Sequence, residues 1–347
     1  MRILHTADLH IQEKKKETID ALEEILRIAE ENKVDVITFG GDIFHSPKDA
    51  DILRPTLRKT FQNAKSRIIA IPGNHDGSIL SKKFDFGFEV IYEEPFGIRE
   101  IDDVAIVGVP YRELPDDDML LDLKHAADNF PTRLLLLHCT LDWGQNRDMY
   151  GGESQRNYFP ISQELLSELK YDFVLAGHFH SIYETIKLDS GIFVYPGSPV
   201  SLTWKELGKR HVAIVDTSKR KIKQVALDTF YYDSLEVNIS PFQERTAFDS
   251  IKAWYDERSN DNNELMVVAK GAISIGESDF QRELEKLATN AIIDNQVRNV
   301  QDVLNHPLFK RFNNLIDERD DQAEVDSVRR LVLRVMSSLL GSEELRL

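Results

Sequence analysis

The chain has little cysteine, no long apolar run and no excess of positive charge. Its 347 residues include one cysteine, Cys139, which excludes an intramolecular disulfide and a thiolate zinc cluster. No apolar stretch approaches the roughly 18 residues needed to cross a bilayer. The N-terminus, Met1-Arg2-Ile3-Leu4, starts a strand directly and shows no secretory leader. We therefore expect a cytoplasmic protein that does not contact a membrane.

The net charge of the chain is -16, from 43 Lys and Arg against 59 Asp and Glu. This balance argues against a protein that coats nucleic acid by bulk charge. It does not exclude an enzyme that holds a phosphodiester locally, because bound divalent cations would invert the field at their site. Basic clusters at residues 14–16, 209–210 and 219–221 are interpreted first as solvated turns.

Strand-like and helix-like segments alternate along residues 1–228. Apolar runs at 3–6 and 34–39 flank a segment of helical period at 17–31. Such alternation predicts a mostly parallel sheet with helices on its faces. From residue 182 onward, strand-like runs separated by turns predict a second, more antiparallel sheet. Together these patterns predict an α/β fold, a four-layer α/β/β/α sandwich.

Two further segments follow the predicted sandwich. Residues 229–297 contain strand-like and helix-like runs and predict a small α+β domain. Residues 298–347 are predicted to be helical, because apolar residues recur there at steps of three and four. These residues are Val325, Val328, Leu331, Val332, Val335, Met336, Leu339 and Leu340.

Polar residues that can bind metal ions follow five of the predicted strands. They lie in Asp8-Leu9-His10, Gly41-Asp42, Gly73-Asn74, His138 and Gly177-His178-Phe179-His180. Open α/β sheets place their chemistry at the carboxyl ends of strands. Side chains two residues apart on an extended segment point the same way, so each Asp-x-His or His-x-His pair can serve one site.

The residue types predict a centre of two divalent ions. One ion would take Asp8, His10, Asp42 and His180, and the other would take Asp42, Asn74, His138 and His178. Asp42 is the candidate bridge, since a shared carboxylate is the usual way to hold two ions a few ångströms apart. The oxygen and nitrogen donors without sulfur favour manganese or iron, or else zinc, over calcium.

Such a centre predicts the hydrolysis of phosphoesters. Two divalent ions activate water and neutralise the charge that builds on the phosphate oxygens. His75 follows the predicted ligand Asn74 and is the candidate general acid or transition-state stabiliser. His45 is a second candidate beside the scissile phosphate.

Each motif alone has an ordinary explanation. An isolated Asp-x-His is most often a surface pair, and Gly-Asn-His-Asp is a good turn sequence. Gly-Asp after a strand often caps a helix. The occurrence of all of them, each at the end of a strand, favours a metal site.

Five longer motifs carry a resemblance to a known family. They are His-Thr-Ala-Asp-Leu-His at 5–10, Gly-Gly-Asp-Ile-Phe-His at 40–45, Ile-Pro-Gly-Asn-His-Asp at 71–76, Gly-His-Phe-His at 177–180 and Tyr-Pro-Gly-Ser-Pro at 195–199. Through them the chain resembles the calcineurin-like metallophosphoesterase superfamily and, more narrowly, the SbcD-type nucleases of double-strand-break repair. His45 supports the narrower resemblance, because phosphatases of the superfamily usually carry Asp at that position.

The resemblance implies a manganese-dependent DNA exonuclease and endonuclease, with His75 as the catalytic histidine and His45 as a second active-site histidine. It implies an SMC-like coiled-coil ABC ATPase as partner, and it is compatible with a homodimer. Residues 229–297 would be a DNA-capping domain. The helices of 298–347 would either dock the ATPase coiled coil or pack within their own domain.

Two other functions remain open from the sequence. One is hydrolysis of a small substrate by a cyclic-nucleotide phosphodiesterase or a protein phosphatase, against which the additional C-terminal segments and His45 argue. The other is a non-enzymatic scaffold on a decayed phosphoesterase fold. A scaffold predicts missing ligands, and the motifs above contain the full set.

Overall fold

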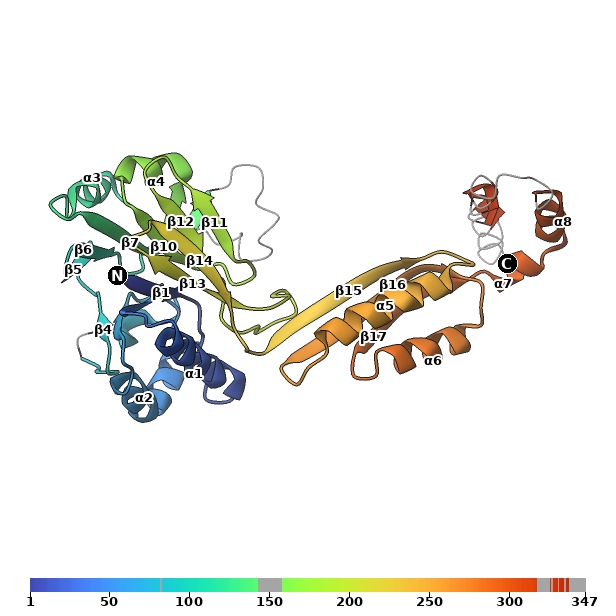
Figure 1. The fold of residues 1–347 in the computed structure, drawn as a ribbon, viewed down its shortest axis with the longest axis horizontal. Helices are drawn as coiled ribbons and strands as arrows, with labels where there is room; N and C mark the ends of the chain where they lie inside the picture. Colours follow the sequence, from blue (N-terminus) through green and yellow to red (C-terminus); the bar gives the residue numbers. More distant parts are fainter. Residues whose placement is uncertain are drawn as a thin grey trace. The chain divides into compact units, whose positions relative to one another are not determined.

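The chain divides into two compact units, Met1–Tyr231 and Tyr232–Leu347 (Figure 1). The computed structural model describes residues 1–81, 83–142, 158–316, 325, 327–329, 331–333 and 335–336. The apolar positions Leu339 and Leu340 of the predicted C-terminal helix lie outside the described residues. Among the described helices, none combines the length and apolarity needed to cross a membrane.

The first unit contains two six-stranded sheets. The first sheet has the order β14-β13-β1-β2-β3-β4. Its strands are β1 (Arg2–Thr6), β2 (Val36–Phe39), β3 (Arg67–Ala70), β4 (Glu89–Val90), β13 (His211–Asp216) and β14 (Lys221–Ala226). Strands β1 to β4 pair in parallel, and β13 pairs antiparallel with both β1 and β14.

The second sheet has the order β11-β12-β10-β7-β6-β5. Its strands are β5 (Gly97–Ile101), β6 (Val104–Gly108), β7 (Thr132–His138), β10 (Phe173–Gly177), β11 (Glu184–Lys187) and β12 (Ile192–Tyr195). Its four central strands are parallel and its two edge strands are antiparallel. Two short strands, β8 (Thr140–Asp142) and β9 (Pro160–Ser162), follow β7 in the sequence and pair in parallel with each other.

The strands after residue 182 do not form a sheet of their own, which corrects the prediction. Strands β11 and β12 extend one edge of the second sheet, and β13 and β14 extend one edge of the first. Each hairpin gains backbone pairing by adding to a strand already present, β10 or β1. The first sheet is therefore antiparallel at one edge, and the second sheet is antiparallel at both edges.

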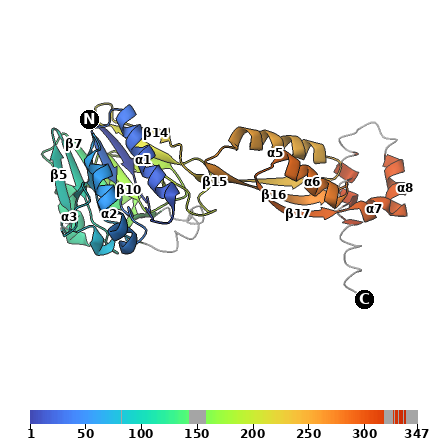
Figure 2. The same cartoon turned by 90° about the horizontal axis from the view of Figure 1, so that it is seen from below.

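Successive side chains along each strand face opposite sides of the sheet, which produces the layers. The predicted four-layer sandwich is confirmed. In β1, Ile3 packs between the two sheets while Leu4 packs under helices, and Leu134 and Leu135 of β7 divide in the same way. Helices α1 (Lys16–Glu31) and α2 (Pro47–Gln62) cover the first sheet (Figure 2). Helices α3 (Asp117–His125) and α4 (Gln163–Leu169) cover the second. A 3-10 turn, η1 (Gly77–Ile79), follows the third motif.

The second unit is a three-stranded sheet with helices along it. Its strands are β15 (Tyr231–Ile239), β16 (Asn263–Ile273) and β17 (Ile292–Asn299), and its helices are α5 (Glu244–Arg258), α6 (Glu277–Leu287), α7 (Gln301–Asn305) and α8 (Pro307–Ile316). Helix α6 connects the parallel strands β16 and β17, and the α5 and α6 ribbons run along the sheet in Figure 2. Strand β17 was not predicted from the sequence.

The predicted C-terminal stripe divides between a small core and the surface. Val332 and Met336 pack against a cluster that contains Val303, Phe309 and Leu333. Val328, Leu331 and Val335 are exposed. Part of the stripe therefore packs within its own unit, and part of it faces outward.

Candidate metal centre

The loops that carry the predicted ligands meet at the carboxyl ends of β1, β2, β3, β7 and β10. The amides of Asp8 and His10 donate to the carbonyls of Gly41 and Asp42, each at 3.0 Å, so the first two loops run together. The amide of Cys139, after β7, donates to the Gly177 carbonyl of β10 at 3.2 Å. Parallel pairing within each sheet brings these ends to one edge, as expected for the chemistry of an open α/β sheet.

Four of the predicted ligands have a left-handed backbone. The φ angles are 55° at Asp8, 43° at His10, 50° at Asp42 and 115° at His178. Residues other than glycine rarely adopt positive φ, and such conformations persist where the surrounding structure imposes them. Among the described residues, four of the eleven non-glycine residues with positive φ are predicted ligands.

Two glycines allow the loops to approach closely. A Cβ atom on Gly73 would lie 2.2 Å from Asp42 Oδ1, and one on Gly41 would lie 2.5 Å from His138 Nδ1. Gly41 also has a φ of 98°, which a side chain would disfavour. The Gly-Gly and Pro-Gly turns therefore leave the room in which Asp42, Asn74 and His138 come together.

Asp8, His10 and His180 form one group of potential ligands. Their candidate ligand atoms all lie within 4.8 Å of one another. His10 Nε2 is 3.1 Å from His180 Nε2, and His180 Nε2 is 3.9 Å from Asp8 Oδ1. The Asp8 carboxylate also accepts the amide of His178, at 2.9 and 3.1 Å.

Asn74, His138 and His178 lie around a second position. The His138 Nδ1 atom is 2.9 Å from the Gly40 carbonyl, which can only accept, so Nδ1 carries the proton and Nε2 carries a lone pair. That Nε2 lies 3.0 Å from Asn74 Oδ1. The rings of His138 and His178 are 5.4 Å apart.

Asp42 lies between the two groups. Its Oδ2 atom is 3.8 Å from His10 Nε2 and 3.6 Å from His138 Nε2. The carboxylate is buried, and its other oxygen accepts the amide of His75 at 2.8 Å. This is the position required of a carboxylate that bridges two ions.

The donor atoms fit divalent metal ions better than protons. The lone pair of His138 Nε2 faces the Asn74 amide oxygen, and the Nε2 atoms of His10 and His180 face each other at 3.1 Å, and a bound cation would satisfy both pairs. Burial, followed by the neighbouring histidines His180 and His75, holds the pKa of His10 well below its ordinary value, which disfavours a proton as that cation. Imidazole, carboxylate and amide donors without sulfur suit a first-row divalent metal.

His75 and His45 lie beside the first group, with His75 half-buried and His45 exposed. The His75 ring is 4.7 Å from that of His10, and the His45 ring is 5.7 Å from each of them. His75 Nδ1 is 3.1 Å from the His45 carbonyl, so Nδ1 carries the proton and Nε2 is left for proton transfer. Partial burial and His75 lower the pKa of His45.

Asp76 ties two of the loops together, a role that the sequence analysis did not assign. Its buried carboxylate accepts the amides of Gly73 at 2.8 Å, Phe44 at 3.0 Å and Ile43 at 3.3 Å. Burial, followed by repulsion from Asp42, raises the pKa of Asp76. Its place in the Gly-Asn-His-Asp motif was the available signal, but two of its three partner amides, those of Ile43 and Phe44, come from another loop.

Glu206 and Arg210 also lie beside the site and were missed. Both side chains are buried, so the interpretation of the basic cluster at 209–210 as a solvated turn is wrong for Arg210, although Lys209 is exposed. Glu206 Oε1 is 3.4 Å from His180 Nδ1. Arg210 donates to the carbonyls of Ser198, at 2.9 Å, and His180.

His5 links the two sheets beneath the centre. Its Nε2 atom is 3.1 Å from the Ala176 carbonyl and its Nδ1 atom is 3.1 Å from Thr38 Oγ1. The carbonyl requires a proton on Nε2, so Nδ1 accepts from the threonine hydroxyl. Burial lowers the pKa of His5 to about 4, and the ring is neutral.

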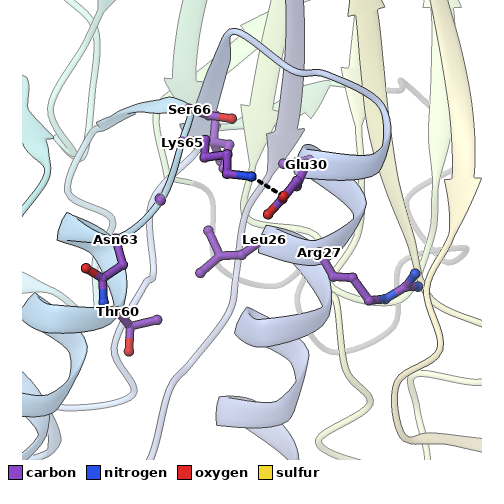
Figure 3. Close-up of a pocket in the computed structure, with 10 residues that line it drawn as sticks. Leu26, Arg27, Glu30, Thr60, Asn63, Lys65 and Ser66 are labelled. Carbon is purple, nitrogen blue, oxygen red and sulfur yellow. Dashed lines mark hydrogen bonds and ion pairs between the residues drawn. The ribbon is translucent and has the colours of Figure 1, made fainter.

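A cavity of about 430 Å³ between α1 and α2 is distinct from these loops (Figure 3). Its cationic side chains are already paired. Arg27 contacts Glu24 and Glu31, and Lys65 contacts Glu30. The cavity offers no concentration of catalytic groups comparable to the strand-end loops, which are the candidate functional site.

A buried cluster of imidazole, carboxylate and amide donors at the strand ends of a four-layer α/β sandwich defines a metallophosphoesterase. The chain belongs to the calcineurin-like phosphoesterase family, whose sequence profile matches residues 1–181, more than half of its 347 residues.

Curated relatives of this chain include DNA repair proteins. It is 25% identical to the DNA double-strand break repair protein Mre11 of Saccharolobus solfataricus over 227 residues, 60% of this chain and 56% of that protein. It is 26% identical to the protein of the same name from Methanosarcina mazei over 234 residues, 63% of this chain and 36% of that one. The matches thus span only part of the relatives' length. Among solved structures, a dimetal phosphatase from Danio rerio is similar over 65% of this chain and 96% of its own, with 11% identity and a TM-score of 0.42.

Proposed function

We propose that this protein is a two-metal DNA nuclease that hydrolyses phosphodiester bonds during the processing of double-strand breaks, as an exonuclease and an endonuclease. The observation that carries the proposal is the position of Asp42, whose carboxylate lies 3.6 to 3.8 Å from a histidine of each ligand group. A shared carboxylate between two nitrogen-rich groups is suited to a pair of ions acting on one phosphate. Relatives named for double-strand-break repair support DNA as the substrate.

The proposed centre assigns each ligand to an ion. Asp8, His10, Asp42 and His180 would hold one ion, and Asp42, Asn74, His138 and His178 would hold the other. Mn²⁺ is the proposed metal, because the donors are of mixed hardness and include no sulfur. When bound, the two ions would polarise the phosphate and supply an activated water.

His75 and His45 are the proposed catalytic residues. The His45 carbonyl holds the Nδ1 proton of His75, so Nε2 is the nitrogen that can take up a second proton. In that doubly protonated form, His75 can deliver the Nε2 proton to the leaving oxygen as a general acid. His45 is exposed and its ring lies 5.7 Å from that of His75, so it can contact a phosphate from the solvent side. Neither residue is needed to hold an ion in this assignment.

We propose roles for the remaining segments on the basis of the resemblance to SbcD-type nucleases. Residues 1–228 would be the nuclease domain, residues 229–297 would cap the DNA, and the helices of 298–347 would dock an SMC-like coiled-coil ABC ATPase. Exposed apolar side chains near the C-terminus support a docking role: Leu308, Leu315, Leu331 and Val335. A homodimer and a cytoplasmic location remain predictions.

The test is a cleavage assay on linear duplex and single-stranded DNA with added manganese. We expect degradation by the wild type and its loss in His75→Ala, with manganese binding retained. His125→Ala is the matched control, since His125 is an exposed histidine on α3 whose ring pairs with Asp128. Cleavage by His75→Ala at the wild-type rate would refute the catalytic assignment. Turnover of bis-nitrophenyl phosphate without DNA cleavage, even with the partner ATPase present, would favour a small substrate instead.

A further inference from the structure

We propose that Glu206 and Arg210 are positioning residues for His180, one setting its ring tautomer and the other fixing its backbone. This inference rests on the proposed metal centre, but it does not depend on DNA being the substrate. It identifies a part of the centre that lies outside the ligand motifs, in the segment between β12 and β13.

The Glu206 carboxylate is placed to orient the His180 ring. It is 2% exposed, and it accepts the Leu202 amide at 2.7 Å and lies 3.3 Å from Ser198 Oγ. Its other oxygen is 3.4 Å from His180 Nδ1. A buried carboxylate surrounded by donors acts as an acceptor, so it favours the tautomer that carries the proton on Nδ1.

That tautomer leaves the lone pair on Nε2, where a metal ligand requires it. His180 Nε2 is 3.1 Å from His10 Nε2 and 3.9 Å from Asp8 Oδ1. The proton on the far nitrogen of a ligating histidine is commonly held by a carboxylate or a carbonyl, which fixes the ring and increases its basicity. Glu206 therefore does for His180 what the Gly40 carbonyl does for His138.

The different exposure of the two rings explains why His180 has a charged acceptor, Glu206, whereas His138 has a neutral one, the Gly40 carbonyl. The His138 side chain is 0% exposed, whereas that of His180 is 17% exposed. A ring that reaches solvent can exchange a neutral acceptor for water. A buried carboxylate competes better, because hydrogen bonds to an ionised acceptor are stronger than those to a neutral one.

Arg210 holds the backbone of the same ligand. Its guanidinium donates to the carbonyls of His180 and Ser198, and the Ser198 amide also donates to the His180 carbonyl, at 3.0 Å. Gly197, with a φ of 73°, keeps this junction open, since a Cβ there would lie 3.0 Å from the His180 oxygen. Both residues therefore act on the same predicted ligand, Glu206 on its ring and Arg210 on its backbone.

The first measurement uses the metal-free full-length protein with nitrogen-labelled histidine. We expect the NMR signals of the His180 ring to report a proton on Nδ1 in the wild type and to shift toward the other tautomer in Glu206→Ala. His180→Gln assigns the signals. Glu206→Gln should retain most of the wild-type state, because its amide oxygen can still accept from Nδ1. An unchanged tautomer in Glu206→Ala would overturn the role of Glu206.

The second measurement is manganese binding by equilibrium dialysis. We expect Glu206→Ala and Arg210→Met each to lower the affinity for one of the two manganese ions by about 10- to 100-fold. This is the usual effect of removing a residue that hydrogen-bonds to a metal ligand. Glu244→Gln is the matched control, since Glu244 is a buried glutamate that accepts the Ser274 amide in the second unit. Equal affinities in all variants would overturn the inference, whereas a wild type that binds no manganese would instead refute the proposed centre.

Discussion

At the scale of single residues, the loops of the centre are held together by one another's carboxylates. Asp8 accepts the amide of His178, Asp42 accepts the amide of His75, and Asp76 accepts the amide of Phe44. Each bond joins two loops that are distant in sequence, and each carboxylate lies in or next to a ligand segment. Two of these carboxylates, Asp8 and Asp42, belong to predicted ligands, so the same residues would bind metal and join the loops that carry the site.

The ligand residues could be predicted from sequence because they occur in short motifs, but their support could not. Asp8, Asp42 and His178 were predicted to be ligands, and the structure brings them together at one edge. Glu206 lies in none of the ligand segments, and no local pattern distinguishes it from a surface glutamate. Its position beside His180 depends on how the segment between β12 and β13 crosses the edge of the sheets, which is a tertiary property.

His5 provides a prediction about pH and stability at this scale. Burial lowers its pKa from 6.5 to about 4 in the folded chain. The unfolded chain therefore takes up a proton first as the pH falls below 6.5, so folding loses stability between pH 6.5 and 4 and loses no more below that range. The full effect is on the order of 3 kcal/mol, at about 1.4 kcal/mol per unit.

Urea unfolding of the metal-free protein across pH 4 to 7 tests this expectation. The non-titrating variant His5→Gln keeps a donor and an acceptor between the sheets, so it removes the titration while leaving polar partners for Thr38 and Ala176. We expect the stability of the wild type to fall more steeply than that of the variant as the pH decreases. Parallel curves for the two proteins would show that His5 does not titrate as inferred.

At the scale of elements, apolar periodicity predicted most of the helices and strands. Other features depend on pairing between strands that are distant in the sequence. Strand β17 begins Ile292-Ile293 but continues with Asp294 and Asn295, residue types that are depleted in strands. It forms because β16 supplies a parallel partner from Met266 to Ile273. The hairpins after residue 182 were recognised as strands, but their sequence does not reveal which sheet they would extend.

Helix α2 adjoins the candidate centre, because its N-cap residue, Ser46, directly follows His45. Ser46 Oγ accepts the Asp49 amide at 3.2 Å, and Pro47 occupies the first turn. We expect Ser46→Ala to lower the free energy of unfolding by about 1 kcal/mol. It should also reduce kcat for phosphodiester hydrolysis, because His45 and its carbonyl, which orients His75, would be held less firmly.

Helix α4 offers the matched comparison. Ser162 caps it in the same way, with Oγ accepting the Leu165 amide at 3.2 Å, and α4 covers the outer face of the second sheet. Ser162→Ala should cost a similar amount of stability and leave kcat unchanged. Equal kinetic effects of the two substitutions, measured with bis-nitrophenyl phosphate and manganese, would contradict a specific link between α2 and His45.

At the scale of the whole molecule, every residue assigned to the candidate centre belongs to the first compact unit, Met1–Tyr231. The unit has its own cores between and outside its sheets. The second unit has a separate core along its three-stranded sheet. Truncation can therefore separate the proposed chemistry of the first unit from the proposed DNA contact of the second.

We expect a fragment of residues 1–231 to fold, bind manganese and hydrolyse bis-nitrophenyl phosphate with a kcat/KM close to that of the full chain. Its degradation of duplex DNA should fall by about tenfold or more, because a tethered second contact with a long substrate raises the effective concentration at the site. Adding the second unit as a separate chain should not restore the rate, since the tether is missing. If the fragment degrades DNA as fast as the full chain, the second unit does not hold DNA. Partner docking would then be the remaining proposed role of its exposed apolar residues. If the fragment instead loses the small substrate as well while remaining folded, the centre itself depends on residues beyond Tyr231.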